Sequence, residues 1–374
     1  MKRLAMPLLA ASLAISAGAQ QPAKWRLVEE WRVGGEPDGA LSFTDVRGMR
    51  VMPDGRLVIL DYKDQQVHFL DSHGKPLRTV GRKGAGPGEY QEANGLIVAP
   101  TGEIIVNDPR NNRLSILAAS GDFITSVRPQ PWGYGYIWNA HFDPDGRLNE
   151  DLRFRKSGDT AYVNGRRKWS RDFVKSDSVE TPLCTTASAA RPEEFFYAFR
   201  TARGGGNIGV PFVQPKVSIA SSNDGYTWAG VYPEYLTVER RAEGKCDVAS
   251  TIRLAGPRLP VPKVARDSAE ETVRKFAARY TTDAPDLSKI PRLLPAFTAL
   301  YIDNANRVWV ERESASGARR FEVFSPTGAP VAALDLSVEL VSYRPVVITN
   351  DHIYAFTSDT DGLQYLVSLK ILRN

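Results

Sequence analysis

The sequence is poor in the side chains that most often bind metal ions. Its 374 residues include two cysteines and four histidines. Two cysteines cannot make a structural zinc site by themselves, because such a site takes four ligands. Neither the His-Glu-x-x-His pattern of zinc hydrolases nor the Gly-x-Ser-x-Gly pattern of serine hydrolases occurs. We therefore expect no metal and no cofactor, and no motif identifies a catalytic residue.

Long apolar runs and a strong excess of one charge are also missing. After the first residues, no apolar run approaches the ~20 residues of a membrane-spanning helix. The formal net charge is +5, whereas nucleic-acid binding needs a more concentrated basic face. We therefore expect neither a transmembrane segment nor a nucleic-acid partner. One basic cluster is interpreted as a solvated strand face, with an anion-binding surface as the alternative: Arg153, Arg155, Lys156, Arg166, Arg167, Lys168 and Arg171.

The N-terminus has the three parts of a cleavable signal peptide. Lys2 and Arg3 form a basic start, residues 4–15 are apolar, and the segment 17–19 has a small-x-small cleavage pattern. We expect residues 1–19 to be removed and the protein to be periplasmic or secreted; the alternative is an uncleaved N-terminal anchor. Because these compartments are oxidising, we predict a disulfide between Cys184 and Cys246, with two unpaired thiols as the alternative.

Six tight turns recur along the chain at nearly regular distances. Asn, Asp and Gly in these turns supply the positive φ angles that tight hairpins need. Consecutive turns lie 47, 44 and 45 residues apart in three intervals, the length of a four-stranded propeller blade. Two other intervals, of 79 and 81 residues, contain a blade and an insertion, at about 180–212 and 256–295. The turns lie at residues 53–55, 100–102, 144–146, 223–225, 303–306 and 350–351.

This repeat predicts an all-β fold, a six-bladed β-propeller formed by residues 20–374 as a monomer. The last blade shows only three strands, near 345–349, 352–357 and 364–372. An open sheet edge would pair promiscuously, so we predict that residues 25–33 supply the outer strand and close the ring. The alternative is an independent N-terminal strand packed elsewhere. Blades 1 and 2 are predicted near 46–52, 56–61, 65–71 and 75–81, and near 93–99, 103–108, 112–118 and 123–129.

The glycine-rich stretch 82–90 and the strands after it resemble NHL repeats. The resemblance rests on Gly84-Ala85-Gly86-Pro87-Gly88-Glu89-Tyr90, the Pro-x-Gly turns, Ile105-Val106-Asn107-Asp108, Asn111-Asn112-Arg113 and Leu114-Ser115-Ile116. The chain is similar to exported bacterial six-bladed propellers of the NHL-repeat/TolB-like group, which are mostly of unassigned function. The resemblance implies the fold and little about chemistry. The glycines open no helix, so we interpret the stretch as a connector between blades 1 and 2 rather than a nucleotide loop.

The second insertion contains a predicted helix over 268–280. Ser268 and Glu271 have the spacing of a capping box, and apolar residues such as Val273 and Ala277 follow at helical spacing. Both insertions connect an outer strand to the next inner strand, so they are expected at one mouth of the channel. The helix is interpreted either as packed on the rim or as a lid over a binding site.

Candidate ligand-binding residues lie where the inner strands begin. A ring of charged and amide side chains can bind a small polar or anionic ligand; the alternative is a water-filled channel with satisfied polar walls. Asp61 and Asp108 end second strands at equivalent positions, and we predict that they cap loop amides. The candidates are Arg47, Asn94, Asn139, His141, Lys216 and Arg344, with Asp45, Glu92 and Thr298 beside them.

These patterns favour a non-catalytic binding module. Its ligand would be a small polar or anionic molecule, a saccharide, a peptide or a partner protein. Related propellers include lactonases and other metal-dependent hydrolases and a lyase, so the resemblance implies a hydrolase or lyase using the channel as the alternative. The segment 359–362 is interpreted as a hairpin turn, because it lacks the remaining ligands of a calcium loop.

Overall fold

A computed structural model describes most of the chain. It describes residues 22–35, 41–129, 138–155, 162–173, 175–180, 196–201, 204–212, 219–222, 224–230, 237–242, 245, 247–313, 318–341 and 343–373. The predicted signal peptide, Lys216, Cys184 and Cys246 lie outside the described residues. No helix in the described part of the chain is long and apolar enough to cross a membrane.

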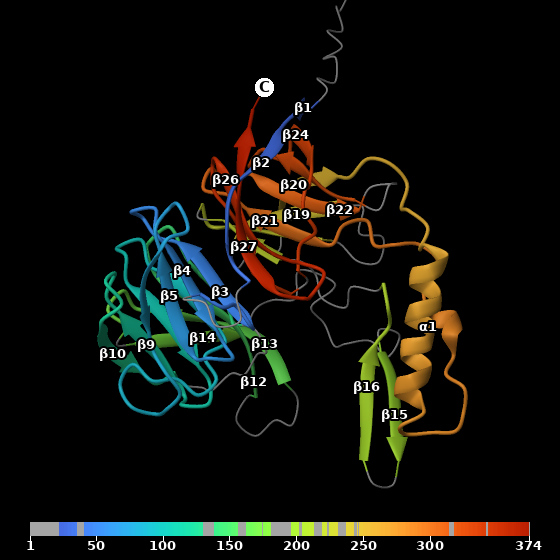
Figure 1. Cartoon of the computed structure of the whole chain (residues 1–374), viewed down its shortest axis with the longest axis horizontal. Coiled ribbons are helices and arrows are strands. Elements are labelled where there is room, and N and C mark those ends of the chain that lie inside the picture. Colours follow the sequence, from blue (N-terminus) through green and yellow to red (C-terminus); the bar gives the residue numbers. More distant parts are fainter. Residues whose placement is uncertain are drawn as a thin grey trace, which may run out of the picture.

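The protein is a six-bladed β-propeller, as the repeat predicted (Figure 1). Each blade is an antiparallel sheet whose strands follow the chain from the inner to the outer edge. Blade 1 contains β3 (Val46–Val51), β4 (Leu57–Asp61), β5 (Gln66–Leu70) and β6 (Pro76–Val80). Blade 2 contains β7 (Gly95–Val98), β8 (Ile104–Asp108), β9 (Arg113–Leu117) and β10 (Phe123–Val127). Blade 3 contains β11 (Asn139–Phe142), β12 (Leu148–Arg155), β13 (Tyr162–Trp169) and β14 (Ser176–Glu180).

The second half of the chain repeats this order with additions from the N-terminus. Blade 4 contains β17 (Ile219–Ser221), β18 (Tyr226–Gly230), β19 (Thr237–Ala242) and β20 (Val248–Arg253). Blade 5 contains β21 (Ala299–Ile302), β22 (Val308–Glu313), β23 (Arg319–Phe324) and β24 (Pro330–Asp335), with β1 (Ala23–Lys24) added in parallel to β24. Blade 6 contains β25 (Val347–Ile348), β26 (His352–Ser358), β27 (Gln364–Leu372) and β2 (Arg26–Gly34).

The inner hairpin of every blade is closed by a backbone hydrogen bond at an equivalent place, across four residues in blades 1 to 5 and three in blade 6. The first turn shows the pattern: the Met52 amide donates to the Arg56 carbonyl, and Gly55 has a φ of 86°. In the five other hairpins the amide-to-carbonyl bond runs from Ala99 to Glu103, Asp143 to Arg147, Ser222 to Tyr226, Asp303 to Arg307 and Thr349 to His352. All six predicted turns are therefore confirmed, and they place residues of different blades in equivalent register.

Strand β2 closes the ring, as predicted. It pairs antiparallel with β27 from Arg26↔Leu372 to Gly34↔Tyr365 and forms the outer edge of blade 6. Just before it, Trp25 is buried against Trp309 of blade 5, with ring centroids 5.9 Å apart. The N-terminal segment thus joins the last two blades and covers an edge that would otherwise be open.

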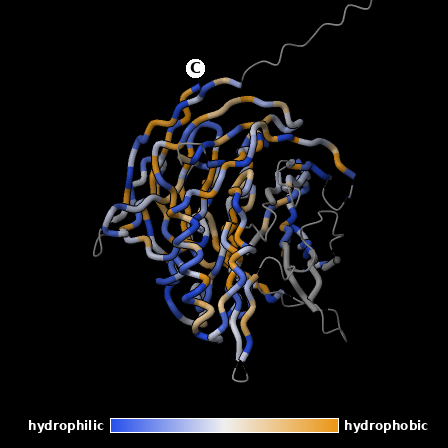
Figure 2. The backbone as a smooth tube through the Cα atoms, turned by 90° about the vertical axis from the view of Figure 1, so that its right-hand side faces the viewer, coloured by the Kyte–Doolittle hydropathy of each residue, from blue (hydrophilic) through white to orange (hydrophobic). Residues whose placement is uncertain are grey.

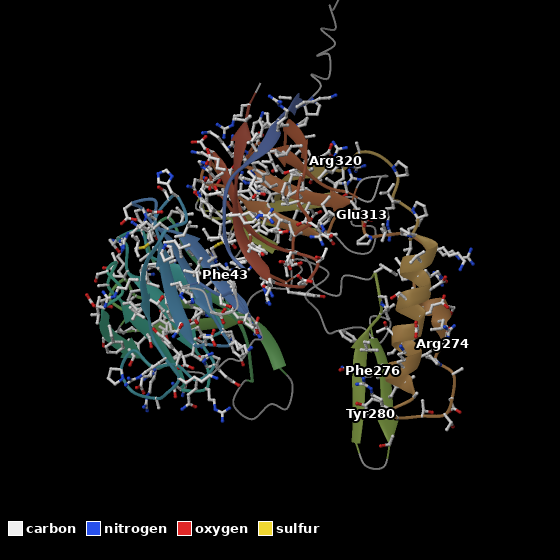
Figure 3. All side chains as sticks on the ribbon, in the orientation of Figure 1. Phe43, Arg274, Phe276, Tyr280, Glu313 and Arg320 are labelled. Carbon is white, nitrogen blue, oxygen red and sulfur yellow. The ribbon has the colours of Figure 1, made fainter. Side chains whose placement is uncertain are left out.

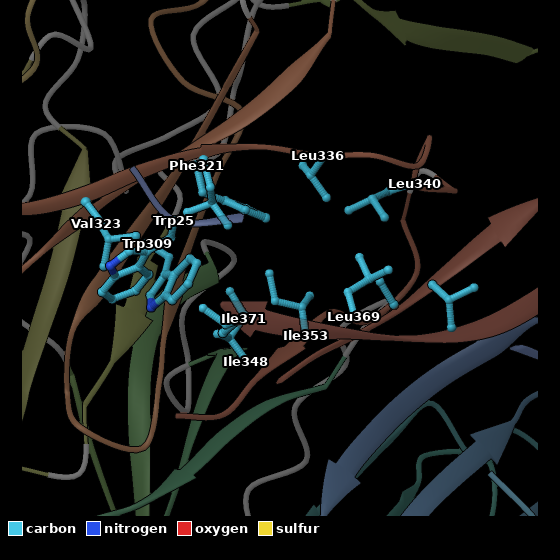
Figure 4. Packing of buried hydrophobic residues seen from close by; sticks show 14 residues of the cluster. Trp25, Trp309, Phe321, Val323, Leu336, Leu340, Ile348, Ile353, Leu369 and Ile371 are labelled. Carbon is cyan, nitrogen blue, oxygen red and sulfur yellow. The ribbon is translucent and has the colours of Figure 1, made fainter. Parts of the chain in front are cut away.

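The apolar core lies between neighbouring blades. Adjacent inner strands contact each other from β25 to β3, β7 and β11, and from β17 to β21 and β25. Figure 4 shows the cluster between blades 5 and 6, where Trp25, Trp309 and Phe321 face Leu369 and Ile353. Hydrophobic and hydrophilic residues alternate along the strands in Figure 2, because successive side chains point to opposite faces of a sheet.

The glycine-rich stretch is a connector, as the sequence indicated. Lys83 bridges to Tyr90, and the Tyr90 ring is fully buried in the cluster between blades 1 and 2. The Arg113 guanidinium donates to the carbonyl groups of Ala85, Gly86 and Glu89 at 2.5–3.0 Å. One buried arginine thus supplies the donors that the loop carbonyls need.

The two insertions pack against each other and form one unit, which we call the arm. The first contributes a hairpin, β15 (Phe196–Thr201) and β16 (Gly204–Gly209); the second contributes α1 (Lys263–Ala277) and a short helix η2 (Leu287–Lys289). In Figure 1 the arm lies to one side of the blades. Its small core contains Tyr197, Val210, Val273 and Ile290. Figure 3 shows Phe276 and Tyr280 on the helical side, and both pack on Phe199 of the hairpin.

The predicted capping box is wrong. The helix begins at Lys263 after Pro262, and no side chain caps it. Ser268 lies inside the helix, where its carbonyl accepts a hydrogen bond from the Thr272 hydroxyl, and Glu271 pairs with Lys275 at 2.7 Å. Proline can precede a helix without capping it, because its fixed φ suits the helix start. The helix covers the other insertion; whether it acts as a lid stays a hypothesis.

Candidate functional site

The loops at the start of the inner strands are held by buried carboxylates. Asp61 accepts hydrogen bonds from the amides of Thr44 (2.8 Å) and Lys63 (2.9 Å). Asp108 accepts from the Glu92 amide at 3.0 Å and from the Asn111 side chain at 2.5 Å. The prediction that these two carboxylates cap loop amides is confirmed. They also place the loop that enters each inner strand beside the loop between the second and third strands.

Two arginines from neighbouring blades share one carboxylate at this face. Arg47 donates to Asp45 through Nε (3.0 Å) and Nη2 (2.7 Å). Arg344, from the loop before blade 6, donates to Asp45 Oδ1 at 2.8 Å and to the Thr44 carbonyl at 3.0 Å. Burial raises the pKa of the Asp45 carboxyl, but the two guanidinium groups outweigh it and hold this pKa below its usual value. Two guanidinium groups thus converge on one carboxylate at this face.

Both arginines of this cluster are held rigidly. The Arg47 guanidinium lies over the Tyr62 ring, 4.0 Å from its centroid, and Arg344 Nε donates to the Gln364 side chain at 2.9 Å. Tyr343, directly before Arg344, is 87% exposed and has a φ of 63°. A bulky residue at positive φ is rare and marks a loop that its surroundings constrain. An exposed tyrosine thus directly precedes Arg344 in the chain.

Of the remaining predicted residues, the structure describes the side chains of Asn94 and His141. Asn94 is buried, and its side-chain oxygen accepts from Asn107 at 2.7 Å. His141 lies in the middle of β11, opposite Asn149. The Asn139 side chain and Lys216 lie outside the described residues. The structure therefore brings together Arg47 and Arg344 with Asp45, and it places Asn94 in the seam between blades.

Sequence reasoning missed Arg50, which lies deeper on the same inner strand. Its Nη1 donates to the carbonyl of Met49 at 2.8 Å, and its side chain is half-buried. Burial lowers the pKa of the Arg50 guanidinium. The turn pattern alone places Arg50 on the inner strand, two positions before the turn-closing residue Met52.

The interpretation of the basic cluster near residue 167 as a solvated face is wrong for Arg167. The Arg167 side chain is 2% exposed and lies 3.3 Å from Glu150. The same carboxylate accepts from the indole nitrogens of Trp138 (2.7 Å) and Trp169 (2.6 Å). Lys168 pairs with Asp143 at 2.5 Å. These charges all lie in blade 3, and the two tryptophans pack in the apolar cluster between blades 2 and 3.

The described residues contain no group of three or more His, Cys, Asp or Glu side chains arranged to hold a metal ion. Asp359 accepts from the amides of Asp361 and Leu363 and from the Tyr365 hydroxyl. Its oxygens are therefore used by the turn itself, which supports the hairpin interpretation of this segment.

Comparisons with known proteins agree with the fold. A family model described as a 6-bladed beta-propeller matches residues 45–128, which contain blades 1 and 2. No curated protein matches the sequence significantly.

Several solved structures match this chain over most of its length at low sequence identity. A protein of Bacteroides fragilis NCTC 9343, provisionally named an exported protein, is 12% identical over 94% of this chain and 95% of that one, with a TM-score of 0.49. A streptogramin B lyase is 14% identical over 91% and 97%, with a TM-score of 0.47. A gluconolactonase from Xanthomonas campestris is 10% identical over 88% and 87%, with a TM-score of 0.46. Similarity at this level concerns the fold alone.

Proposed function

We propose that this chain is an exported, non-catalytic binding module that takes a small anionic ligand at the channel mouth. The observation that carries the proposal is the sharing of Asp45 by Arg47 and Arg344. Two guanidinium groups converge here, and planar guanidinium groups suit carboxylate and phosphate oxygens. Tyr343, the exposed residue that precedes Arg344, would offer its ring to the rest of the ligand.

Thermal-shift screening with small organic acids, sugar acids and phosphate esters tests this proposal. A ligand present at about 100 times its Kd stabilises the folded protein by about 2.7 kcal/mol. We expect Arg344→Gln to reduce this stabilisation. The control is Arg78→Gln, which removes an arginine paired with Asp122 at 2.7 Å on the outer strand of blade 1. Equal ligand-induced shifts in the two variants would contradict a site at the mouth.

Export and the disulfide are separate parts of the proposal. We expect the mature protein to begin near Gln20, which N-terminal sequencing of the periplasmic or secreted fraction checks. Intact mass measured without reductant should be lower by two hydrogens than after reduction, as a Cys184–Cys246 bond requires. Two thiols that react with a labelling reagent before reduction would exclude this bond.

A further inference from the structure

We infer that Arg50 binds an oxyanion, a carboxylate or a phosphate, inside the central channel. This inference rests on the proposed function, because it places the charged end of the same ligand deeper than the mouth. The position of the guanidinium, its charge balance and the residues at equivalent positions support it.

The guanidinium lies on the channel side of the innermost strand. Arg50 is opposite Val58, two positions before Met52, whose amide closes the hairpin by donating to Arg56. In an antiparallel ladder, residue pairs that exchange two backbone hydrogen bonds alternate with pairs whose N–H and C=O groups point away from each other. Arg50 and Val58 therefore exchange bonds, and the Met49 carbonyl points away from β4. Since Arg50 Nη1 donates to that carbonyl at 2.8 Å, its head lies at the inner edge of the blade.

No described carboxylate neutralises this cation. Among the described residues, no Asp or Glu oxygen lies within 4.0 Å of the Arg50 side chain, whereas Arg47 and Arg344 both reach Asp45. Burial lowers the pKa of Arg50. A partly buried charge without a counter-ion is costly to the fold, and a bound oxyanion would remove that cost.

The equivalent positions of the other blades carry different side chains. Counted from each turn-closing bond, they are Ile97, His141, Ala220, Tyr301 and Val347. Tyr301 turns outward, since its hydroxyl donates to Glu311 at 2.8 Å. The repeat therefore does not require an arginine at this position, which agrees with a ligand-binding role in blade 1.

Arg47 and Arg50 are three residues apart on one strand, so their backbones are separated by about 10 Å. An elongated anion with charged groups at both ends fits this spacing better than a single small ion. Dicarboxylates, a phosphorylated carboxylic acid and inorganic phosphate alone therefore form the probe set.

Calorimetric titration of these probes into the full-length mature protein tests the inference. We expect Arg50→Gln to weaken the best probe at least tenfold, and Arg78→Gln to leave it unchanged. Carboxylate and phosphate probes of equal length identify which oxyanion is preferred. If Arg344→Gln abolishes binding and Arg50→Gln does not weaken it, the proposed function stands and this inference fails. Absence of binding by every probe to the unmodified protein overturns both.

The melting temperature of the ligand-free Arg50→Met variant distinguishes a binding role of Arg50 from a structural one. Removing an unpaired charge relieves its desolvation cost, so we expect Arg50→Met to melt about 2 °C higher. A lower melting temperature together with unchanged probe affinity would show that Arg50 is a structural residue.

Discussion

Replacement of Glu150 by glutamine tests how the seam between blades 2 and 3 is held. The carboxylate accepts from two indole nitrogens, at 2.6 and 2.7 Å, and lies beside the buried Arg167. Glutamine would present an NH₂ group to one indole and remove the carboxylate charge that lies 3.3 Å from Arg167. Removing one partner of a buried ion pair costs about 3–5 kcal/mol. We expect Glu150→Gln to lower the free energy of unfolding by about 3 kcal/mol.

Urea denaturation followed by tryptophan fluorescence measures this loss, because Trp138 and Trp169 report on the same seam. The matched control is Asp122→Asn, which breaks an ion pair whose two side chains are 64% and 45% exposed. Exposed pairs contribute about 0–1 kcal/mol. The double variant Glu150→Gln/Arg167→Met should recover part of the loss, because it also removes the buried cation that faced the Glu150 carboxylate. Equal effects of Glu150→Gln and Asp122→Asn would refute the reasoning.

Three further predictions follow from single contacts. Gly74→Ala should destabilise the folded protein by about 1–3 kcal/mol more than Gly55→Ala. Both glycines have positive φ, but only at Gly74 would the new methyl group lie 2.7 Å from a tryptophan. Equal melting temperatures of the two variants would contradict this. Burial lowers the pKa of His68, so the unfolded chain binds a proton there more readily and the stability of the fold decreases as pH drops below 6.5. His68→Gln should make the melting temperature depend less on pH between pH 7 and 5. An unchanged slope would exclude this cause. Val273→Asp should open the arm to limited proteolysis without changing the melting of the blades, whereas Val264→Asp, at an 81% exposed position of the same helix, should not; equal cleavage would mean that α1 does not pack as described.

Much of the fold could be predicted because the repeat is written in local chemistry. A hairpin turn needs positive φ at one position, which Gly55 and Asn306 supply, so each blade leaves a mark in the sequence. The predicted strands of blades 1, 2 and 6 agree with the structure to within about two residues. The closing strand followed from counting, since the last blade lacked an outer strand.

The start of α1 could not be read in the same way. Ser268 and Glu271 have capping-box spacing, yet the helix already begins at Lys263, after Pro262. Within each of the ion pairs Lys263–Asp267 and Lys275–Glu271, the two partners are one helical turn apart along α1. A capping pattern is a local preference, and packing of Val273 and Ala277 against the hairpin decides where the helix runs.

The candidate site shows the same division. The turn register placed Arg47 and Arg344 at one face of the ring, because residues at the same position of every blade lie at the same level. Their shared contact with Asp45 depends on the closeness of blades 6 and 1, because Arg344 and Asp45 are 299 residues apart in sequence. The sequence by itself determined the six blades, since turn chemistry and strand alternation are local. Only the tertiary structure decided which charges find partners, because charge pairing depends on distances between strands and blades: Asp45 is shared by two arginines, and Arg167 is buried with Glu150. Among the described residues, no carboxylate pairs with Arg50.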